Sequence, residues 1–98
     1  MPLYRLVDAE KRHARYPKTF WIPRLSVRKS LKKGDRAQLI FSGKERMWVV
    51  VTERHTCPAC GRRWYAGTLQ NQPVDVPIKF GARMEFKPKH VIQVERHP

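Results

Sequence analysis

A series of short strand-like segments, separated by turn residues, limits the fold of this chain more than any other feature. From residue 34 onward, apolar and β-branched side chains occur in short runs, and Gly, Pro, Asn or Ser marks a turn roughly every 8–12 residues. The run at 47–52 is the most β-prone and is expected to be the central strand, with 64–69 as its antiparallel partner. The other strands are predicted at 36–41, 83–86 and 90–94. This pattern predicts a mostly β fold, a small antiparallel SH3-like barrel, with a five-stranded OB-type barrel as the alternative.

The first third of the chain has a different character. Asp8 is suited to cap a short helix that runs to about Arg15 and ends before Pro17. The apolar segment 19–23 is expected to lie on the core in an extended conformation. With 98 residues the chain has room for one modest core. We therefore expect a single domain over 1–98, with an N-terminal helix and basic arm over 1–33 and a barrel over 34–95.

Large apolar side chains supply the expected core, and one glycine interrupts a predicted strand. Gly67 lies within 64–69, where it predicts a bulge or a bend. The side chains expected inside are Trp21, Phe41, Met47, Trp48, Phe80 and Phe86.

The chain is strongly basic. It has 21 Lys and Arg against 8 Asp and Glu, for a formal net charge of +13. Such an excess attracts polyanions, and nucleic acid, either DNA or RNA, is the most common partner. An acidic partner protein is the main alternative, and an anionic membrane surface or a role in solubility are lesser ones. No apolar run approaches the roughly 20 residues of a membrane span, and no signal-peptide stretch is present, so we expect a cytoplasmic protein without a membrane partner.

Both cysteines of the chain lie in the segment Cys57-Pro-Ala-Cys60-Gly, within a loop expected over 55–63. Two cysteines at this spacing, followed by glycine, are typical of a turn that presents two thiolates to one metal ion. Zinc needs four ligands, so histidine, carboxylate or a second copy of the chain in a homodimer would have to complete the site. His55 is the nearest candidate in the sequence. A redox-active pair and a pair of inert reduced thiols are the alternatives.

Basic and aromatic residues surround this loop and precede the first predicted strand. Phosphate contacts from Lys and Arg, combined with one exposed ring that stacks on a base, are typical of nucleic-acid binding. Trp64 and Tyr65 point to opposite faces of their strand, so one of them is expected to be exposed. The candidate nucleic-acid-binding residues are Arg24, Arg28, Lys29, Lys32, Lys33, Arg54, Arg62, Arg63, Trp64 and Tyr65. No phosphate-binding glycine loop, nucleophile elbow or paired carboxylates accompany them, and we expect a non-enzymatic protein.

Several motifs over residues 17–94 resemble a widespread family of small uncharacterised bacterial and phage β-barrel proteins. The most specific are the strand Glu-Arg-Met-Trp-Val at 45–49 and the turn Gly-Thr-Leu-Gln-Asn-Gln-Pro-Val at 67–74. Thr-Phe-Trp-Ile-Pro at 19–23, Leu-Lys-Lys-Gly-Asp at 31–35 and Phe-Lys-Pro-Lys-His-Val-Ile at 86–92 add to the similarity. The resemblance implies a self-contained domain and supplies no activity. Members of the family are less basic and have a short acidic or glycine-rich turn in place of the cysteine loop.

Overall fold

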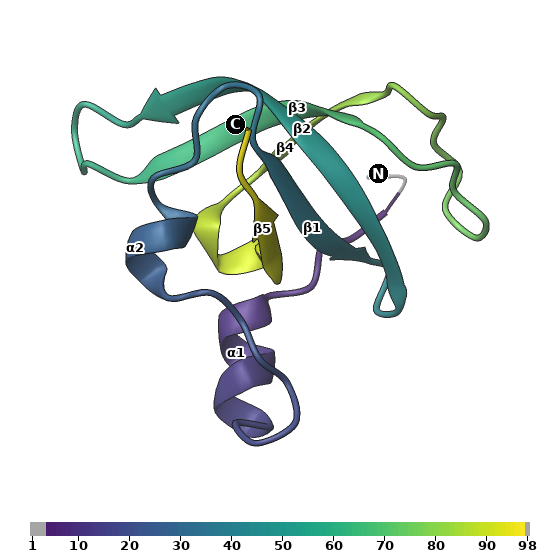
Figure 1. Cartoon of the computed structure of the whole chain (residues 1–98), viewed down its shortest axis with the longest axis horizontal. Coiled ribbons are helices and arrows are strands. Elements are labelled where there is room, and N and C mark those ends of the chain that lie inside the picture. Colours follow the sequence, from purple (N-terminus) through teal and green to yellow (C-terminus); the bar gives the residue numbers. More distant parts are fainter. Residues whose placement is uncertain (1–3, 98) are drawn as a thin grey trace.

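The computed structural model describes residues 4–97. Its strands form one antiparallel sheet of five in the order β4-β3-β2-β1-β5 (Figure 1). The strands are β1 (Arg36–Phe41), β2 (Glu45–Thr56), β3 (Arg63–Leu69), β4 (Arg83–Phe86) and β5 (Gln93–Glu95). The first four follow one another as a meander, and the 3-10 turn η1 (Pro88–His90) then brings β5 back to the outer edge of β1. The predicted mostly β class is confirmed, and the strand order is that of a small SH3-like barrel.

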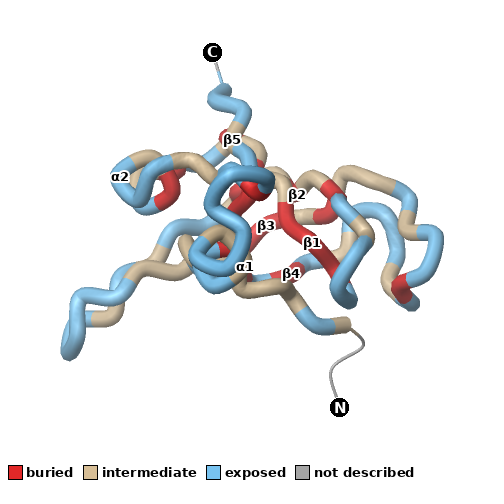
Figure 2. The backbone as a smooth tube through the Cα atoms, turned by 90° about the horizontal axis from the view of Figure 1, so that it is seen from below, coloured by how far each residue is buried: buried red, intermediate tan, exposed pale blue. Residues whose placement is uncertain are grey.

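The core lies along the inner face of the sheet, and alternate residues of β2 and β4 are buried there (Figure 2). Leu39 of β1 and Val49 of β2 are completely buried. The predicted core positions Phe41, Met47 and Phe86 are confirmed, with exposed fractions of 2% or less. The remaining buried side chains of this cluster include Leu31, Ala37, Val51, Tyr65, Leu69, Val76, Met84 and Val91.

Two of the predicted core residues are exposed. Trp21 is 73% exposed, because the extended segment 19–23 turns its neighbour Phe20 inward against Ile40 and Ile92. Phe80 is 58% exposed in the β3–β4 connection. Trp48 is half-buried on the outer face of β2, where the guanidinium of Arg36 lies over its ring.

Two short helices precede the sheet. The predicted helix is confirmed as α1 (Ala9–Arg15), which Asp8 caps by accepting a hydrogen bond from the Lys11 amide at 3.0 Å. The segment expected to be a basic arm contains a second helix, α2 (Leu25–Arg28), whose single turn is too short to give a periodic sequence signal. None of the helices in residues 4–97 is long and apolar enough to cross a membrane.

The β2–β3 hairpin is longer than predicted and projects from the body of the molecule (Figures 1 and 2). β2 continues past the predicted 47–52 to Thr56, so that its last residues pair only with β3. The bulge expected at Gly67 lies on the partner strand, between Val51 and Glu53. Gly67 is required for a different reason, since a Cβ there would lie 2.3 Å from the carbonyl oxygen of Val50.

Candidate functional site

A groove of about 540 Å³ lies between the end of the β2–β3 hairpin and the surface formed by α2 and η1. Figure 1 shows the hairpin tip, α2 and η1 on the left of the molecule and below the sheet. Residues from the hairpin form one wall, and residues from α1, α2 and η1 form the other. The lining residues are Glu10, Leu25, Lys29, Cys57, Cys60, Arg62, Arg63, Trp64, Lys87, Pro88 and Lys89. We call this the hairpin groove.

The charge of the hairpin groove is strongly positive. Five of its lining residues are cations, and Glu10 is the one carboxylate among them. Glu10 is already paired with the guanidinium of Arg28 at 2.6 Å. Among the ion pairs formed within residues 4–97, Lys89 takes part in one, at 3.9 Å from Asp8, and the other four cations of the groove in none. The groove therefore presents cations that carboxylates of the described chain leave unneutralised.

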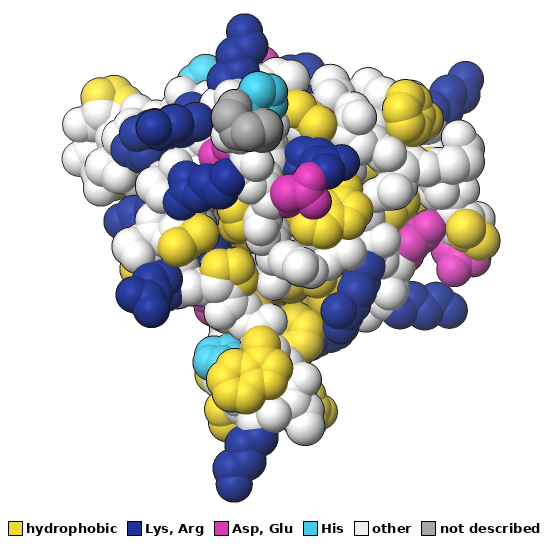
Figure 3. Space-filling view, in the orientation of Figure 1, with side chains coloured by type: hydrophobic (Ala, Val, Ile, Leu, Met, Phe, Trp, Pro, Cys, Tyr) yellow, Lys and Arg dark blue, Asp and Glu magenta, His cyan; other side chains and the backbone are white. Residues whose placement is uncertain are grey.

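Acidic side chains are concentrated elsewhere. On the outer face of the sheet, Arg83 lies 3.3 Å from Glu53 and 3.5 Å from Glu85. The hydrogen bond from His55 and then that from Arg83 hold the pKa of Glu53 below its ordinary value. In Figure 3, Lys and Arg side chains are spread over the visible face, several of them on the side that carries α2, and two acidic side chains lie at the opposite edge. The acidic side chains around Arg83 therefore lie outside the lining of the groove.

Arg28 does not belong to this exposed set. Its side chain is 6% exposed, and its guanidinium donates to the carbonyl oxygens of Pro23 at 2.7 Å and Pro88 at 3.0 Å in addition to Glu10. The expectation that Arg28 contacts a phosphate is incompatible with this burial. Arg28 instead joins α1, α2 and η1, and thereby holds one wall of the groove in place.

Tyr65 is also structural. It is completely buried, its hydroxyl donates to the carbonyl oxygen of Arg28 at 2.7 Å, and it accepts from the Leu31 amide at 3.3 Å. Burial raises the pKa of Tyr65, so the hydroxyl remains protonated and able to donate. Two positions earlier in β3, Arg63 donates to the carbonyl oxygen of Lys29 at 2.8 Å, so two residues of β3 anchor the C-terminal end of α2.

Trp64 is the aromatic residue of the predicted pair that reaches the groove. It is half-buried, and its indole stacks on the ring of His55 with centroids 4.0 Å apart and an interplanar angle of 15°. The same His55 ring lies 3.0 Å from a carboxylate oxygen of Glu53. His55 therefore orients Trp64 and engages Glu53, and it forms no metal-ligand cluster with the two cysteines in the described residues.

Several predicted cations lie outside the groove, and several groove residues were missed. Arg24, Lys32, Lys33 and Arg54 are exposed but do not line the groove. Lys87 and Lys89 flank Pro88 and enter it from η1. A basic pair around a proline is visible in the sequence, but only the return of the chain after β4 brings it opposite Arg62 and Arg63.

The cysteines lie at the tip of the hairpin, in a turn closed by two backbone hydrogen bonds of 2.8 Å. The Cys57 amide donates to the carbonyl oxygen of Arg62, and the Gly61 amide donates to that of Cys57. Gly61 has a φ of 72°, which glycine adopts at little cost. Hydrogen bonds from the Cys60 thiol, then from the amides of Cys60 and Ala59, lower the pKa of Cys57 below its ordinary value. The turn therefore favours a thiolate at Cys57.

His90, in η1, is a half-buried base that supports the groove wall. Its Nδ1 accepts a hydrogen bond from the Lys87 amide at 2.9 Å. Burial, and then the neighbouring Lys89, lower the pKa of His90 from 6.5 to about 4. The folded protein thus keeps His90 neutral at a pH where the unfolded chain protonates it.

We expect this difference to make the protein less stable in mild acid. Below pH 6.5 the unfolded state binds a proton that the folded state binds only near pH 4, so the free energy of unfolding falls through this window and is unaffected above it. Allowing for solvent screening, the loss is about 1–2 kcal/mol. His90→Asn retains an acceptor for Lys87 and should lose less stability than the native chain between pH 6.5 and 4.5 in urea titrations. Parallel pH profiles for the two proteins would contradict this expectation.

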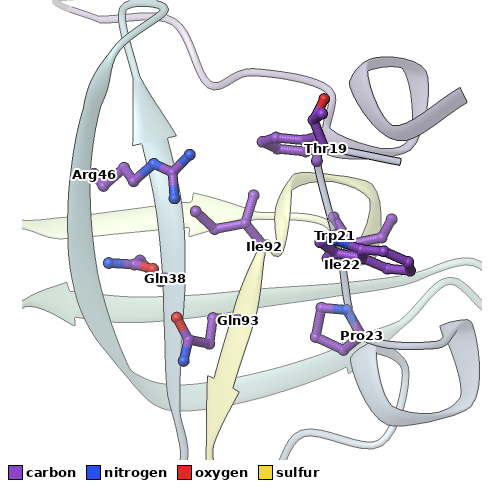
Figure 4. Close-up of a pocket in the computed structure, with 9 residues that line it drawn as sticks. Thr19, Trp21, Ile22, Pro23, Gln38, Arg46, Ile92 and Gln93 are labelled. Carbon is purple, nitrogen blue, oxygen red and sulfur yellow. The ribbon is translucent and has the colours of Figure 1, made fainter. Parts of the chain in front are cut away.

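A second depression, of about 420 Å³, lies between the segment 19–23 and the sheet (Figure 4). In Figure 4, Trp21 and Pro23 lie on one side, Arg46 and Gln38 on the other, and Ile92 lies between them. Arg46 is the one ionisable residue among its lining residues. The site lacks the concentration of charge found in the hairpin groove.

No family model, curated protein or solved structure matches this chain. The two most specific motifs of the family resemblance contact each other in the fold. The carboxylate of Glu45 accepts from the amides of Val74 at 2.7 Å and Asp75 at 3.1 Å, and the Asn71 side chain accepts from the Trp48 amide at 2.5 Å. Both motifs therefore stabilise the long β3–β4 connection, away from the hairpin groove.

Proposed function

We propose that this protein binds nucleic acid without catalysing a reaction, and that the hairpin groove is the binding site. The observation that carries the proposal is the excess of five lining cations over one carboxylate that Arg28 already neutralises. The cations come from the residue after α2, from the start of β3 and the residue before it, and from the η1 region. They therefore line both walls of the groove, as contacts to successive phosphates of a backbone require.

Trp64 favours unpaired bases as the ligand. Its ring lines the groove among the cations, and the stack with His55 restricts its orientation. An ordered indole provides a surface on which a base of a single strand stacks, a contact worth about 1–3 kcal/mol, and bases inside a duplex are not accessible to it. We therefore expect single strands to bind more tightly than duplexes of the same sequence.

An acidic protein segment is the second candidate ligand. Leu25 lines the groove and is 48% exposed, and Trp21, at 73% exposed, lies in the neighbouring segment 19–23. Large exposed apolar side chains beside unneutralised cations suit a peptide that carries both acidic and apolar residues. This candidate predicts a complex that survives nuclease treatment.

Fluorescence anisotropy with single- and double-stranded DNA and RNA, each titrated with salt, tests the proposed function. If the groove is the binding site, the logarithm of the association constant should fall steeply with the logarithm of the salt concentration, and single strands should bind more tightly than duplexes. A difference in affinity between DNA and RNA would indicate contacts to the sugar. Equal binding to all four ligands that disappears near physiological salt would reject the proposal and leave the acidic protein segment as the better candidate.

A further inference from the structure

The tip of the β2–β3 hairpin holds two thiols in a geometry suited to a metal ion. The turn between Cys57 and Arg62 is closed by backbone hydrogen bonds, and it sets the Cys60 thiol beside the sulfur of Cys57. Two cysteines held side by side at this spacing, with a glycine behind them, are the arrangement with which a chain supplies two ligands to one zinc ion.

One copy of the chain supplies only half of a tetrahedral zinc site. Every Cys, His, Asp and Glu of the sequence falls within residues 4–97, because positions 1–3 and 98 are Met, Pro, Leu and Pro. Within 4–97, no three such side chains come together as a group that could hold a metal ion. His55, the nearest histidine, stacks on Trp64 and contacts Glu53. Structural zinc requires four ligands, so the missing two must come from outside the chain.

We infer that Cys57 and Cys60 form half of a zinc site that the same two cysteines of a second copy complete, joining two chains tip to tip. Each of the four thiols loses its proton, and the resulting site of four thiolates and one Zn²⁺ carries a net charge of −2. The inference requires that two tips can meet and that a dianionic site is tolerated between them.

The structure satisfies both requirements. Pro58, Ala59, Cys60 and Gly61 are all exposed at the end of a projecting hairpin, so the thiols can be approached without unfolding (Figures 1 and 2). Glu53 is the last carboxylate before the tip, and none follows it until Asp75. Arg62 follows the tip directly. Negative charge on the shared site would offset the repulsion between the arginines of the two tips.

A shared site would also place two hairpin grooves next to each other, since Cys57 and Cys60 line the groove as well as the tip. A strand long enough to occupy both grooves would then bind with higher effective affinity than one that fills a single groove. This consequence depends on the proposed function, whereas the zinc site itself does not.

The test is a zinc titration of the reduced, metal-free chain in the absence of nucleic acid, followed by light scattering and metal analysis. We expect the mass to rise from 11.6 kDa to twice that value, to saturate at one zinc per two chains, and to revert with a chelator. Cobalt as a probe should give the absorption of a tetrahedral thiolate site with the same stoichiometry. Because nucleic acid is absent, the outcome is independent of whether the groove binds it.

Two variants test the ligand assignment, one that removes a proposed zinc ligand and one that serves as the control. Cys60→Ser changes an exposed side chain at the tip, so its circular dichroism should match that of the native chain while zinc binding and the zinc-dependent dimer are lost. His55→Gln should retain both, because His55 is not a ligand in this scheme. One zinc per monomer, a dimer that forms equally without zinc, loss of zinc in His55→Gln, or no zinc binding at micromolar concentrations would each overturn the inference.

Discussion

Reversing two groove charges, with Arg62→Glu and Lys87→Glu together, is expected to weaken binding to single-stranded nucleic acid by at least about tenfold at moderate salt. Both side chains are exposed and lie on opposite walls of the hairpin groove. Each contributes a phosphate contact in the proposed complex, so the slope of log K against log salt should become shallower by about two. Anisotropy titrations at three or more salt concentrations measure both quantities.

A matched control separates the position of the charges from their number. Lys18→Glu with Lys79→Glu makes the same change in net charge at two exposed positions that do not line the groove. We expect this control to retain most of the affinity and of the salt slope. Equal losses in the two double variants would mean that net charge alone attracts the ligand, and the groove would no longer be the site.

Removing the one carboxylate that lines the groove should change the affinity in the opposite direction in the same assay. Glu10→Gln removes the one negative charge from the lining, so the Arg28 guanidinium is no longer neutralised by it. Binding should therefore become tighter, by severalfold at low salt, because the potential in the groove becomes more positive. Weaker binding in a correctly folded Glu10→Gln protein would contradict the electrostatic account.

Replacing Arg28 with methionine should destabilise the protein by about 3 kcal/mol. The variant leaves the carbonyl oxygens of Pro23 and Pro88 without their donor and the carboxylate of Glu10 without its partner. In a domain of this size such a loss corresponds to a fall in melting temperature of more than about 10 °C. Chemical and thermal denaturation followed by circular dichroism measure it.

Arg24→Met is the control for this change. Arg24 precedes the same helix, is exposed, and makes no capping hydrogen bond with its side chain. A surface substitution of this kind should change stability by no more than about 0.5 kcal/mol. If Arg28→Met costs less than about 1 kcal/mol, the buried guanidinium does not hold α1, α2 and η1 together as its contacts indicate.

The sequence by itself determined the strands and the central part of the core. Alternation of apolar residues marked 36–41 and 47–52, and the structure places strands over both, with Leu39 and Val49 inside. It also located the capped helix after Asp8, because an Asx cap and a following proline are local signals. Such signals depend on neighbours in the chain, and for that reason they are readable without a fold.

The tertiary structure decided which of the charged and aromatic side chains near the candidate site are available to a ligand. Arg28 was predicted to contact a phosphate, and Tyr65 was one of two candidates for the exposed ring, but the fold buries both side chains and satisfies them with long-range hydrogen bonds to Pro88 and from Leu31. Lys87 and Lys89 gave no functional signal until the turn after β4 brought them opposite Arg62. A buried cation and an exposed one differ in the groups around them in the fold. Those groups come from positions far away in the sequence, and they meet only when the chain folds.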